Sequence, residues 1–214
     1  MLLESGQLKK SLNEIENPVE VGRYVGNGDR QAAFDFRRLG SRELARIVNP
    51  LKDTRMPYRI CKTFEIESGH MLSKHPELCK FPHGHSRKVE IVLEAESLDA
   101  NEMVCDFKAL TESLNEYLKT LDHAICVNTQ DPNFKQLKAA YGDRVVAFEA
   151  LDPTTEVIAK AIFDFAKSRL VAYGCNPSAK YPIRPNVQMV KIRLWETSSS
   201  WAEYFDASGT PPRE

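Results

Sequence analysis

The chain has 214 residues, of which 42% are hydrophobic and 28% are charged, and its formal net charge is −1. This length suits one domain with an extension, and it allows a buried core without disulfides. The balanced charge excludes recruitment of nucleic acid or an anionic membrane by a global field. Five cysteines without a CxxC spacing indicate free thiols in a reducing compartment. No signal peptide or apolar run of about 20 residues is present, so we expect a cytoplasmic protein.

Residues 1–57 are rich in charge, Asn and Gly, and we expect a partly ordered N-terminal extension with a short helix over residues 41–48. From Tyr58 onward, apolar and polar residues follow the regular spacing of strands and helices. This predicts a single domain over residues 58–207. Residues 208–214 contain Gly and two prolines and are expected to form a flexible tail.

Two strands are predicted at the start of this domain. Residues 59–67 read as a strand, in which successive side chains point to opposite faces. If the strand continues to His70, that histidine ends its apolar face. Residues 71–82 form a loop interrupted by two prolines. Residues 83–97 then alternate with their odd positions inward, so His83 and His85 share the core face, with Cα atoms roughly 7 Å apart.

Helices are expected next. Asp106 suits an N-cap for a helix that ends near residues 121–123, with apolar positions Phe107, Leu110, Leu114, Leu118 and Leu121. Residues 128–150 read as a polar loop with a helical piece over 134–141. Asp152 as cap and Pro153 in the first turn open another helix. Its predicted buried stripe is Val157, Ile158, Ala161, Ile162 and Phe165.

Strands over residues 187–196 and 200–205 complete the order β-β-α-α-β-β, an α+β arrangement. Glu196 ends the more apolar face of the first of these strands, after Ile192 and Leu194. A carboxylate in that place needs a partner if it is buried, and two carboxylate oxygens suit the N–H groups of a guanine-like ring edge. The alternative is a strand-end glutamate in water.

Three histidines, His70, His83 and His85, can converge where the first two strands pair. Catalytic zinc typically takes three protein ligands and leaves a fourth position open. Cys79, in the loop before His83, can instead be a fourth ligand of a closed structural site. The ordinary alternative is a set of core or loop histidines, and His75 beside Pro76 reads as solvated.

Cys79 is also a candidate base, because nearby lysines and imidazoles favour a thiolate. Asp122 and His123 follow the first helix, and an aspartate that orients an imidazole can serve proton transfer to a thiol. The alternatives are an idle cysteine and a helix-end pair that interacts only with the helix dipole.

With these residues in place, the chain resembles the 6-pyruvoyl-tetrahydropterin synthase / 6-carboxy-tetrahydropterin synthase family over residues 60–205. Six motifs occur in the family's order: Gly69-His70-Met71-Leu72, Cys79 with His83-Gly84-His85, Asp106-Phe107, Leu121-Asp122-His123, Pro153-Thr154-Thr155-Glu156 and Trp195-Glu196-Thr197. The resemblance implies the tunnelling fold, a four-stranded antiparallel sheet with two helices on one side. It also implies trimeric barrels that stack in pairs as a homohexamer, with active sites between subunits.

The resemblance implies a role for each matching residue. His70, His83 and His85 are expected to bind one Zn²⁺ per subunit. Cys79 is expected to act as the general base, with Asp122 and His123 as its proton relay. Glu196 is expected to anchor the pterin ring, and Thr154, Thr155 and Glu156 to line the same pocket from a neighbouring subunit.

Three residues separate Cys79 from His83, and the strand ends in Trp195-Glu196-Thr197-Ser198. Both features resemble the bacterial branch that makes 6-carboxy-5,6,7,8-tetrahydropterin for 7-deazaguanine and queuosine synthesis. A third branch carries glutamate in place of the cysteine, and Cys79 argues against it. The N-terminal 57 residues and the 128–150 loop are additions to the short family core.

The expected activity is therefore a zinc-dependent lyase that acts on 7,8-dihydroneopterin triphosphate and releases triphosphate and acetaldehyde. The alternatives are a 6-pyruvoyl-tetrahydropterin synthase, which eliminates triphosphate only, and a non-catalytic zinc-stabilised pterin-binding protein. A protein-interaction role rests only on the extension. Lys80, Arg87 and Lys88 are either triphosphate contacts or plain surface charge.

Overall fold

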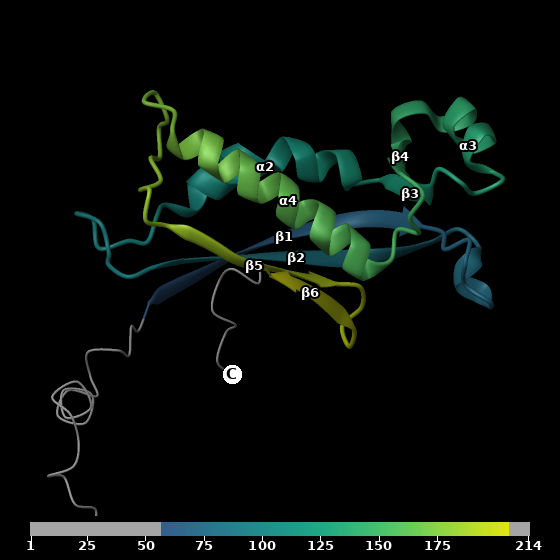
Figure 1. The fold of residues 1–214 in the computed structure, drawn as a ribbon, viewed down its shortest axis with the longest axis horizontal. Coiled ribbons are helices and arrows are strands. Elements are labelled where there is room, and N and C mark those ends of the chain that lie inside the picture. The colour runs from purple at the N-terminus through teal and green to yellow at the C-terminus, as the bar shows by residue number, and fades with distance from the viewer. Residues whose placement is uncertain (1–56, 206–214) are drawn as a thin grey trace, which may run out of the picture. The chain divides into compact units, whose positions relative to one another are not determined.

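The structure, a computed structural model, describes residues 57–205. Six strands form one sheet in the order β4-β3-β1-β2-β5-β6 (Figure 1). The strands are β1 (Tyr58–His70), β2 (His83–Ala95), β3 (Ala124–Asn128), β4 (Val145–Phe148), β5 (Gln188–Trp195) and β6 (Trp201–Phe205). The α-helices are α2 (Phe107–Leu121), α3 (Phe134–Tyr141) and α4 (Thr155–Gly174), with short 3-10 turns at Leu78–Lys80 and Gly142–Arg144. The mixed α+β class predicted from the sequence is confirmed.

The pairing of β1 with β2 sets the geometry of the domain. The two strands are antiparallel over their whole length, from Tyr58 opposite Ala95 to His70 opposite His83. Directly opposed residues in an antiparallel pair point to the same side of the sheet. The even positions of β1 therefore share a face with the odd positions of β2, as the alternation predicted.

That shared face carries the core. Helices α2 and α4 lie together on one side of the sheet (Figure 1), and the apolar side chains between them and the strands are buried. In α2 the leucines predicted to face inward are buried, and Asp106 caps the helix by accepting from the Lys108 N–H at 2.8 Å. Phe107 is an exception, since it is 47% exposed.

The sheet has six strands rather than the four expected, because the chain forms one strand just before the predicted polar loop and another within it. Helix α3 has the predicted bounds, but β3 and β4 extend the sheet beyond β1, with β3 parallel to both β1 and β4. These strands are only five and four residues long, too short for a clear periodic signal. Their burial comes from a small second core of Met71, Val127 and Val145.

The start of α4 also differs from the prediction. Thr154 is the N-cap, and its hydroxyl accepts from the Val157 N–H at 3.4 Å. Asp152 lies outside the helix, buried, and serves another purpose described below. The buried stripe of α4 keeps Ile158 and Ile162 but continues through Ala159, Phe163, Ala166 and Leu170, because the helix packs on both β5 and β6.

Several predictions fall outside the described residues. They are the extension up to residue 56 with its helix over 41–48, the tail 208–214 and the last two residues of the predicted domain. Within residues 57–205, no helix is both long and apolar enough to cross a membrane.

Candidate metal centre and adjoining pocket

The sheet register brings the three predicted histidines together. His70 and His83 are directly opposed, and His85 lies two residues further along β2, opposite Ser68. The Nε2 atom of His70 is 3.0 Å from that of His83 and 3.3 Å from that of His85. One ligand atom from each histidine lies within 4.8 Å of the others, so this group can hold a metal ion.

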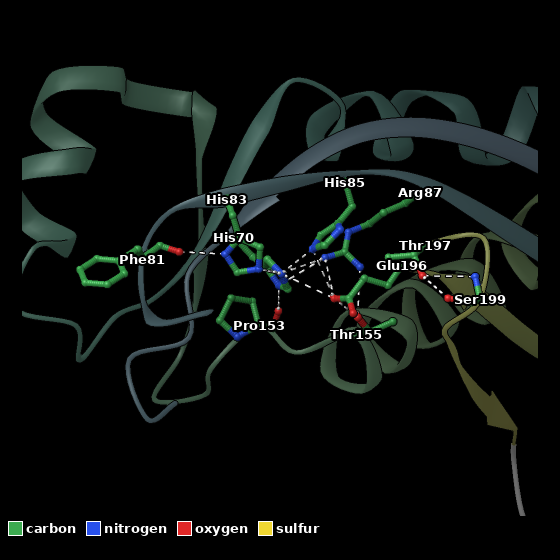
Figure 2. Close-up of polar contacts among 10 residues, drawn as sticks. All are labelled: His70, Phe81, His83, His85, Arg87, Pro153, Thr155, Glu196, Thr197 and Ser199. Carbon is green, nitrogen blue, oxygen red and sulfur yellow. Dashed lines mark hydrogen bonds and ion pairs between the residues drawn. The ribbon is translucent and has the colours of Figure 1, made fainter. Parts of the chain in front are cut away.

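Backbone carbonyls orient two of the rings. Nδ1 of His70 lies 2.8 Å from the Pro153 carbonyl oxygen, and Nδ1 of His83 lies 2.8 Å from that of Phe81 (Figure 2). A carbonyl oxygen only accepts, so Nδ1 carries the proton in both rings and Nε2 presents its lone pair. This outer contact is the usual way in which proteins fix a metal-binding imidazole.

Burial also favours the neutral form of these histidines. The pKa of His70 is lowered to about 4, chiefly by burial; the Pro153 contact opposes this shift, and the charge of the nearby Arg87 adds to it. Burial and then Arg87 likewise lower the pKa of His85. Neutral imidazole is the form that binds metal ions, and three such nitrogens suit zinc and other borderline cations. The donor set therefore fits a bound metal.

Glu196 lies beside this group, immediately after β5. Its Oε1 atom is 3.6 Å from Nε2 of both His70 and His85, and it accepts a hydrogen bond from the Thr155 hydroxyl at 2.7 Å. Burial raises the pKa of Glu196, but the Thr155 hydrogen bond and the Arg87 charge outweigh it, so the pKa lies below its usual value. Glu196 is thus a charged member of the site rather than a solvated strand end.

Arg87 is the site residue that sequence reasoning misplaced. It was expected on the surface or against triphosphate, yet its side chain is fully buried. Nη1 donates to the Thr155 hydroxyl at 3.1 Å, and Nη2 is 3.5 Å from Oε1 of Glu196 (Figure 2). Arg87 lies at an odd position of β2, between His85 and Val89, and the odd positions face inward. The alternation in the sequence could therefore have predicted that its side chain is buried.

The threonines at the start of α4 divide in their roles. Thr155 is buried and joins Arg87 to Glu196 within the same chain, and its expected contribution to a neighbouring subunit's pocket stays a prediction. Thr154 caps the helix, and Glu156 is exposed. The helix start therefore completes the centre from the side opposite the strands.

Cys79 lies in the 3-10 turn before β2 and is half-buried. Its backbone oxygen accepts from the Leu72 N–H at 3.0 Å, which closes the loop between β1 and β2. The three-histidine group does not include it, and within residues 57–205 its thiol makes no hydrogen bond. Cys79 thus lies outside the three-histidine group.

Asp122 and His123 form a pair at the end of α2. Nδ1 of His123 is 3.0 Å from Oδ2 of Asp122, while Oδ1 accepts from the Glu67 N–H at 2.8 Å. That N–H is the main reason why the pKa of Asp122 lies below its usual value. His123 has a positive φ of 55°, and its side chain is 74% exposed.

A pocket of about 520 Å³ lies beside His123. His85 and His123 both line it, together with Gly69, Ser86, Tyr141 and Arg144 among others. Tyr141 and Arg144 come from the segment between β3 and β4, and Arg144 donates to the Asp122 carbonyl at 3.1 Å. The segment between β3 and β4 therefore supplies one wall of the pocket, next to Ala124 and Ile125 of β3.

Residues 59–207 match the family described as 6-pyruvoyl tetrahydropterin synthase. The chain belongs to this family. A 6-carboxy-5,6,7,8-tetrahydropterin synthase from Aquifex aeolicus is 30% identical over 167 residues, which are 70% of this chain and 98% of the relative. The enzyme of the same name from Haemophilus influenzae is 26% identical, over 69% of this chain and 98% of that relative.

Solved structures show the same fold at lower identity. An uncharacterized protein from Wolinella succinogenes is 21% identical with a TM-score of 0.57, covering 71% of this chain and 99% of its own. A 6-pyruvoyl tetrahydropterin synthase from Plasmodium vivax is 17% identical with a TM-score of 0.52, covering 70% of this chain and 97% of its own. These likenesses support the fold, and the family assignment rests on the sequence matches.

Proposed function

We propose that the chain is a zinc-dependent lyase that converts 7,8-dihydroneopterin triphosphate to 6-carboxy-5,6,7,8-tetrahydropterin, with release of acetaldehyde and triphosphate. The convergence of His70, His83 and His85 beside Glu196 carries this proposal. The curated relatives named above support the carboxy-forming branch. The short spacing from Cys79 to His83 agrees with that branch.

The three histidines would hold one zinc ion per subunit through their Nε2 atoms. Zinc supplies Lewis acidity, which makes C–H bonds next to a bound substrate oxygen more acidic. The chain's own contribution is to keep the imidazoles neutral and oriented. Burial and the carbonyls of Pro153 and Phe81 support that role.

Proton transfer would fall to Cys79 and to the Asp122–His123 pair. Cys79, free of metal ligation, would remove a proton from the substrate as general base. Asp122 accepts from the Nδ1 side of His123, so Nε2 of that ring would be the atom that exchanges protons. The exposure of His123 and its place in the pocket support this assignment.

Glu196 would anchor the pterin ring. Oε1 of Glu196 already accepts from Thr155, whereas Oε2 has no hydrogen bond within residues 57–205. An ionised carboxylate with one unengaged oxygen is suited to accept from a ring N–H or an exocyclic amino group. The lowered pKa of Glu196 supports the ionised form.

The assembly proposed with this function is a cytoplasmic homohexamer, a dimer of trimers, in queuosine synthesis. Strands β4 and β6 are the two edges of the sheet, and such edges offer unpaired backbone groups to another strand. Glu156, exposed in the single chain, would then reach a neighbouring pocket. Light scattering that gives a monomer at micromolar concentration would contradict this assembly.

The decisive experiment is incubation of the zinc-loaded protein with 7,8-dihydroneopterin triphosphate, followed by mass-spectrometric identification of the products. We expect 6-carboxy-5,6,7,8-tetrahydropterin, acetaldehyde and triphosphate. Absence of triphosphate release would overturn the synthase proposal. Formation of 6-pyruvoyl-tetrahydropterin as the sole product would overturn only the branch.

A Cys79→Ala variant tests the division between base and ligands. Turnover should fall by at least about a hundredfold, as expected for loss of a general base, while zinc stays at one per chain. Loss of zinc together with Cys79 would instead indicate a closed four-ligand structural site.

A further inference from the structure

Arg87 places a full positive charge next to nitrogen atoms that can bind a metal cation. Its side chain has no exposed surface, and Nη2 lies 3.2 Å from Nδ1 and 3.4 Å from Nε2 of His70. A guanidinium cannot lose its proton under ordinary conditions. The charge is therefore permanent, and it cannot move into solvent.

A bound metal cation would leave the site with an excess of positive charge. Glu196 is the one carboxylate that contacts Arg87 within the described residues, so guanidinium and carboxylate together have no net charge. Three neutral imidazoles add none, and a divalent cation would bring the site to a net charge of +2. A buried excess of this kind favours an anionic ligand.

The hydrogen-bond balance leads to the same conclusion. The Nη2–Oε1 distance to Glu196 is 3.5 Å, well beyond the roughly 2.7–2.9 Å of a strong charge-assisted bond. Thr155 takes one bond from Nη1, and Nε is buried with no partner. The remaining partners of this guanidinium, Thr155 and His70, are neutral, so one long carboxylate contact compensates its buried charge only in part.

We propose that Arg87 is an anion-recognition residue of the histidine centre. Its buried charge would attract a carboxylate or alkoxide oxygen of a ligand bound beside His70, a few ångströms from Nη2 and without direct contact. The ligand class is a small oxyanion or a substrate whose reacting side chain bears one. This inference rests on the proposed metal centre but not on the proposed pterin reaction.

The proposal predicts effects of opposite sign on the two kinds of ligand. Removal of the Arg87 charge removes repulsion against a divalent cation, so metal binding should tighten. The same change removes electrostatic attraction for an anion, so anion binding should weaken. A purely structural arginine would weaken both, because its loss would loosen the whole site.

The experiment compares the wild-type protein with Arg87→Met, which removes the charge but keeps an unbranched side chain, and Arg87→Lys, which keeps the charge. Zinc affinity is measured by competition with a chromophoric chelator. Anion affinity is measured by titrating the cobalt-loaded protein with acetate and following its visible spectrum. Arg169→Met, at an exposed position of α4, serves as the matched control.

For Arg87→Met we expect zinc affinity to rise by about tenfold and acetate affinity to fall by about tenfold, since two charges a few ångströms apart interact by more than one decade of affinity. Arg87→Lys and Arg169→Met should stay within about threefold of wild type on both measures. Loss of both affinities in Arg87→Met, or no change in either, would overturn the proposal.

Glu196→Gln provides a second arm that remains if Arg87→Met does not fold. Loss of this carboxylate raises the net charge, so zinc affinity should fall and acetate affinity should rise. Unchanged or reduced acetate affinity in this variant would also contradict the proposal. Neither arm uses a pterin, so failure of the synthase assay leaves this test intact.

Discussion

The two ends of one sheet face have opposite chemistry although they are built from the same strands. At one end Ile91, Leu93 and Ile192 are at most 1% exposed and pack beneath the helices. At the other end the inward positions carry His70 and Arg87, which are just as deeply buried. Burial is therefore common to both ends, and the difference lies in what surrounds the side chains.

The polar end is possible because the start of α4 supplies partners. Pro153 offers a carbonyl to His70, and Thr155 bonds to both Arg87 and Glu196. Buried polar groups cost free energy unless they are paired. The apolar end thus stabilises the fold, while the polar end gives up some stability for a group of side chains that can hold a cation.

The largest effect is expected at the apolar end. Ile192→Ala removes a fully buried side chain between β5 and the helices. The free energy of unfolding should fall by about 2–5 kcal/mol, because the variant loses transfer free energy and leaves a cavity. Urea denaturation with and without zinc measures this fall in the free energy of unfolding. Zinc affinity of the folded variant should change less than about threefold, and a larger change would break the proposed division.

At the polar end, His83→Ala should abolish stoichiometric metal binding. The metal-free form should lose less than about 1 kcal/mol, since His83 is only half-buried. The wild-type protein should gain about 2.7 kcal/mol from zinc at 100 times the dissociation constant, and the variant should gain none. His75→Ala is the matched control, because His75 lies outside the group and should leave the gain intact. Equal zinc stabilisation of both variants would refute the site.

Asp152→Asn tests the support of the polar end. Asp152 accepts from the Ser73 hydroxyl, the Lys74 N–H and the Asn128 amide at 2.7–2.8 Å, and it precedes the Pro153 that orients His70. We expect a loss of about 1–2 kcal/mol in unfolding free energy and about tenfold in zinc affinity. Chelator competition and urea denaturation measure these losses. Unchanged zinc affinity would show that the Pro153 carbonyl is held by other contacts.

The same residue gives a pH dependence. Burial raises the pKa of Asp152, but its hydrogen bonds outweigh that effect, and the pKa lies below its usual value. The unfolded state therefore binds the proton more readily, so this contribution to stability is present above about pH 4 and is lost as the pH falls through the folded pKa. Unfolding curves of wild type and Asp152→Asn should converge as the pH is lowered through that range. A difference that stays constant would exclude the ionised carboxylate as its source.

The smallest effect concerns thiol reactivity. Burial raises the pKa of Cys126 to about 12 and that of Cys105 to about 11, whereas Cys175 is exposed. Because the thiolate is the reactive form, iodoacetamide at pH 8 should label Cys175 and leave the other two unmodified in the folded protein. Peptide mass spectrometry after a timed quench measures this. Labelling of Cys126 at the rate of Cys175 would show that the core beside the site opens readily.

Much of the fold was determined by local sequence. Alternation in β1 and β2 and leucine spacing in α2 identified these elements, and the bounds of α3 were also predicted. The same alternation placed His70, His83 and His85 on one inward face, because side-chain direction in a strand depends only on the parity of the position. The three-histidine group needed only the pairing of two strands that are neighbours in the chain.

The rest was decided by tertiary structure. The strands β3 and β4 are too short to show a period, and Asp152, predicted as a helix cap, is buried among Ser73, Lys74 and Asn128. The sequence around Arg87 does not identify its partners, since Thr155 and Glu196 lie 68 and 109 positions away in the chain. Local sequence sets which way a side chain points, whereas the partner that makes its burial tolerable comes from elements that only the folded chain brings together.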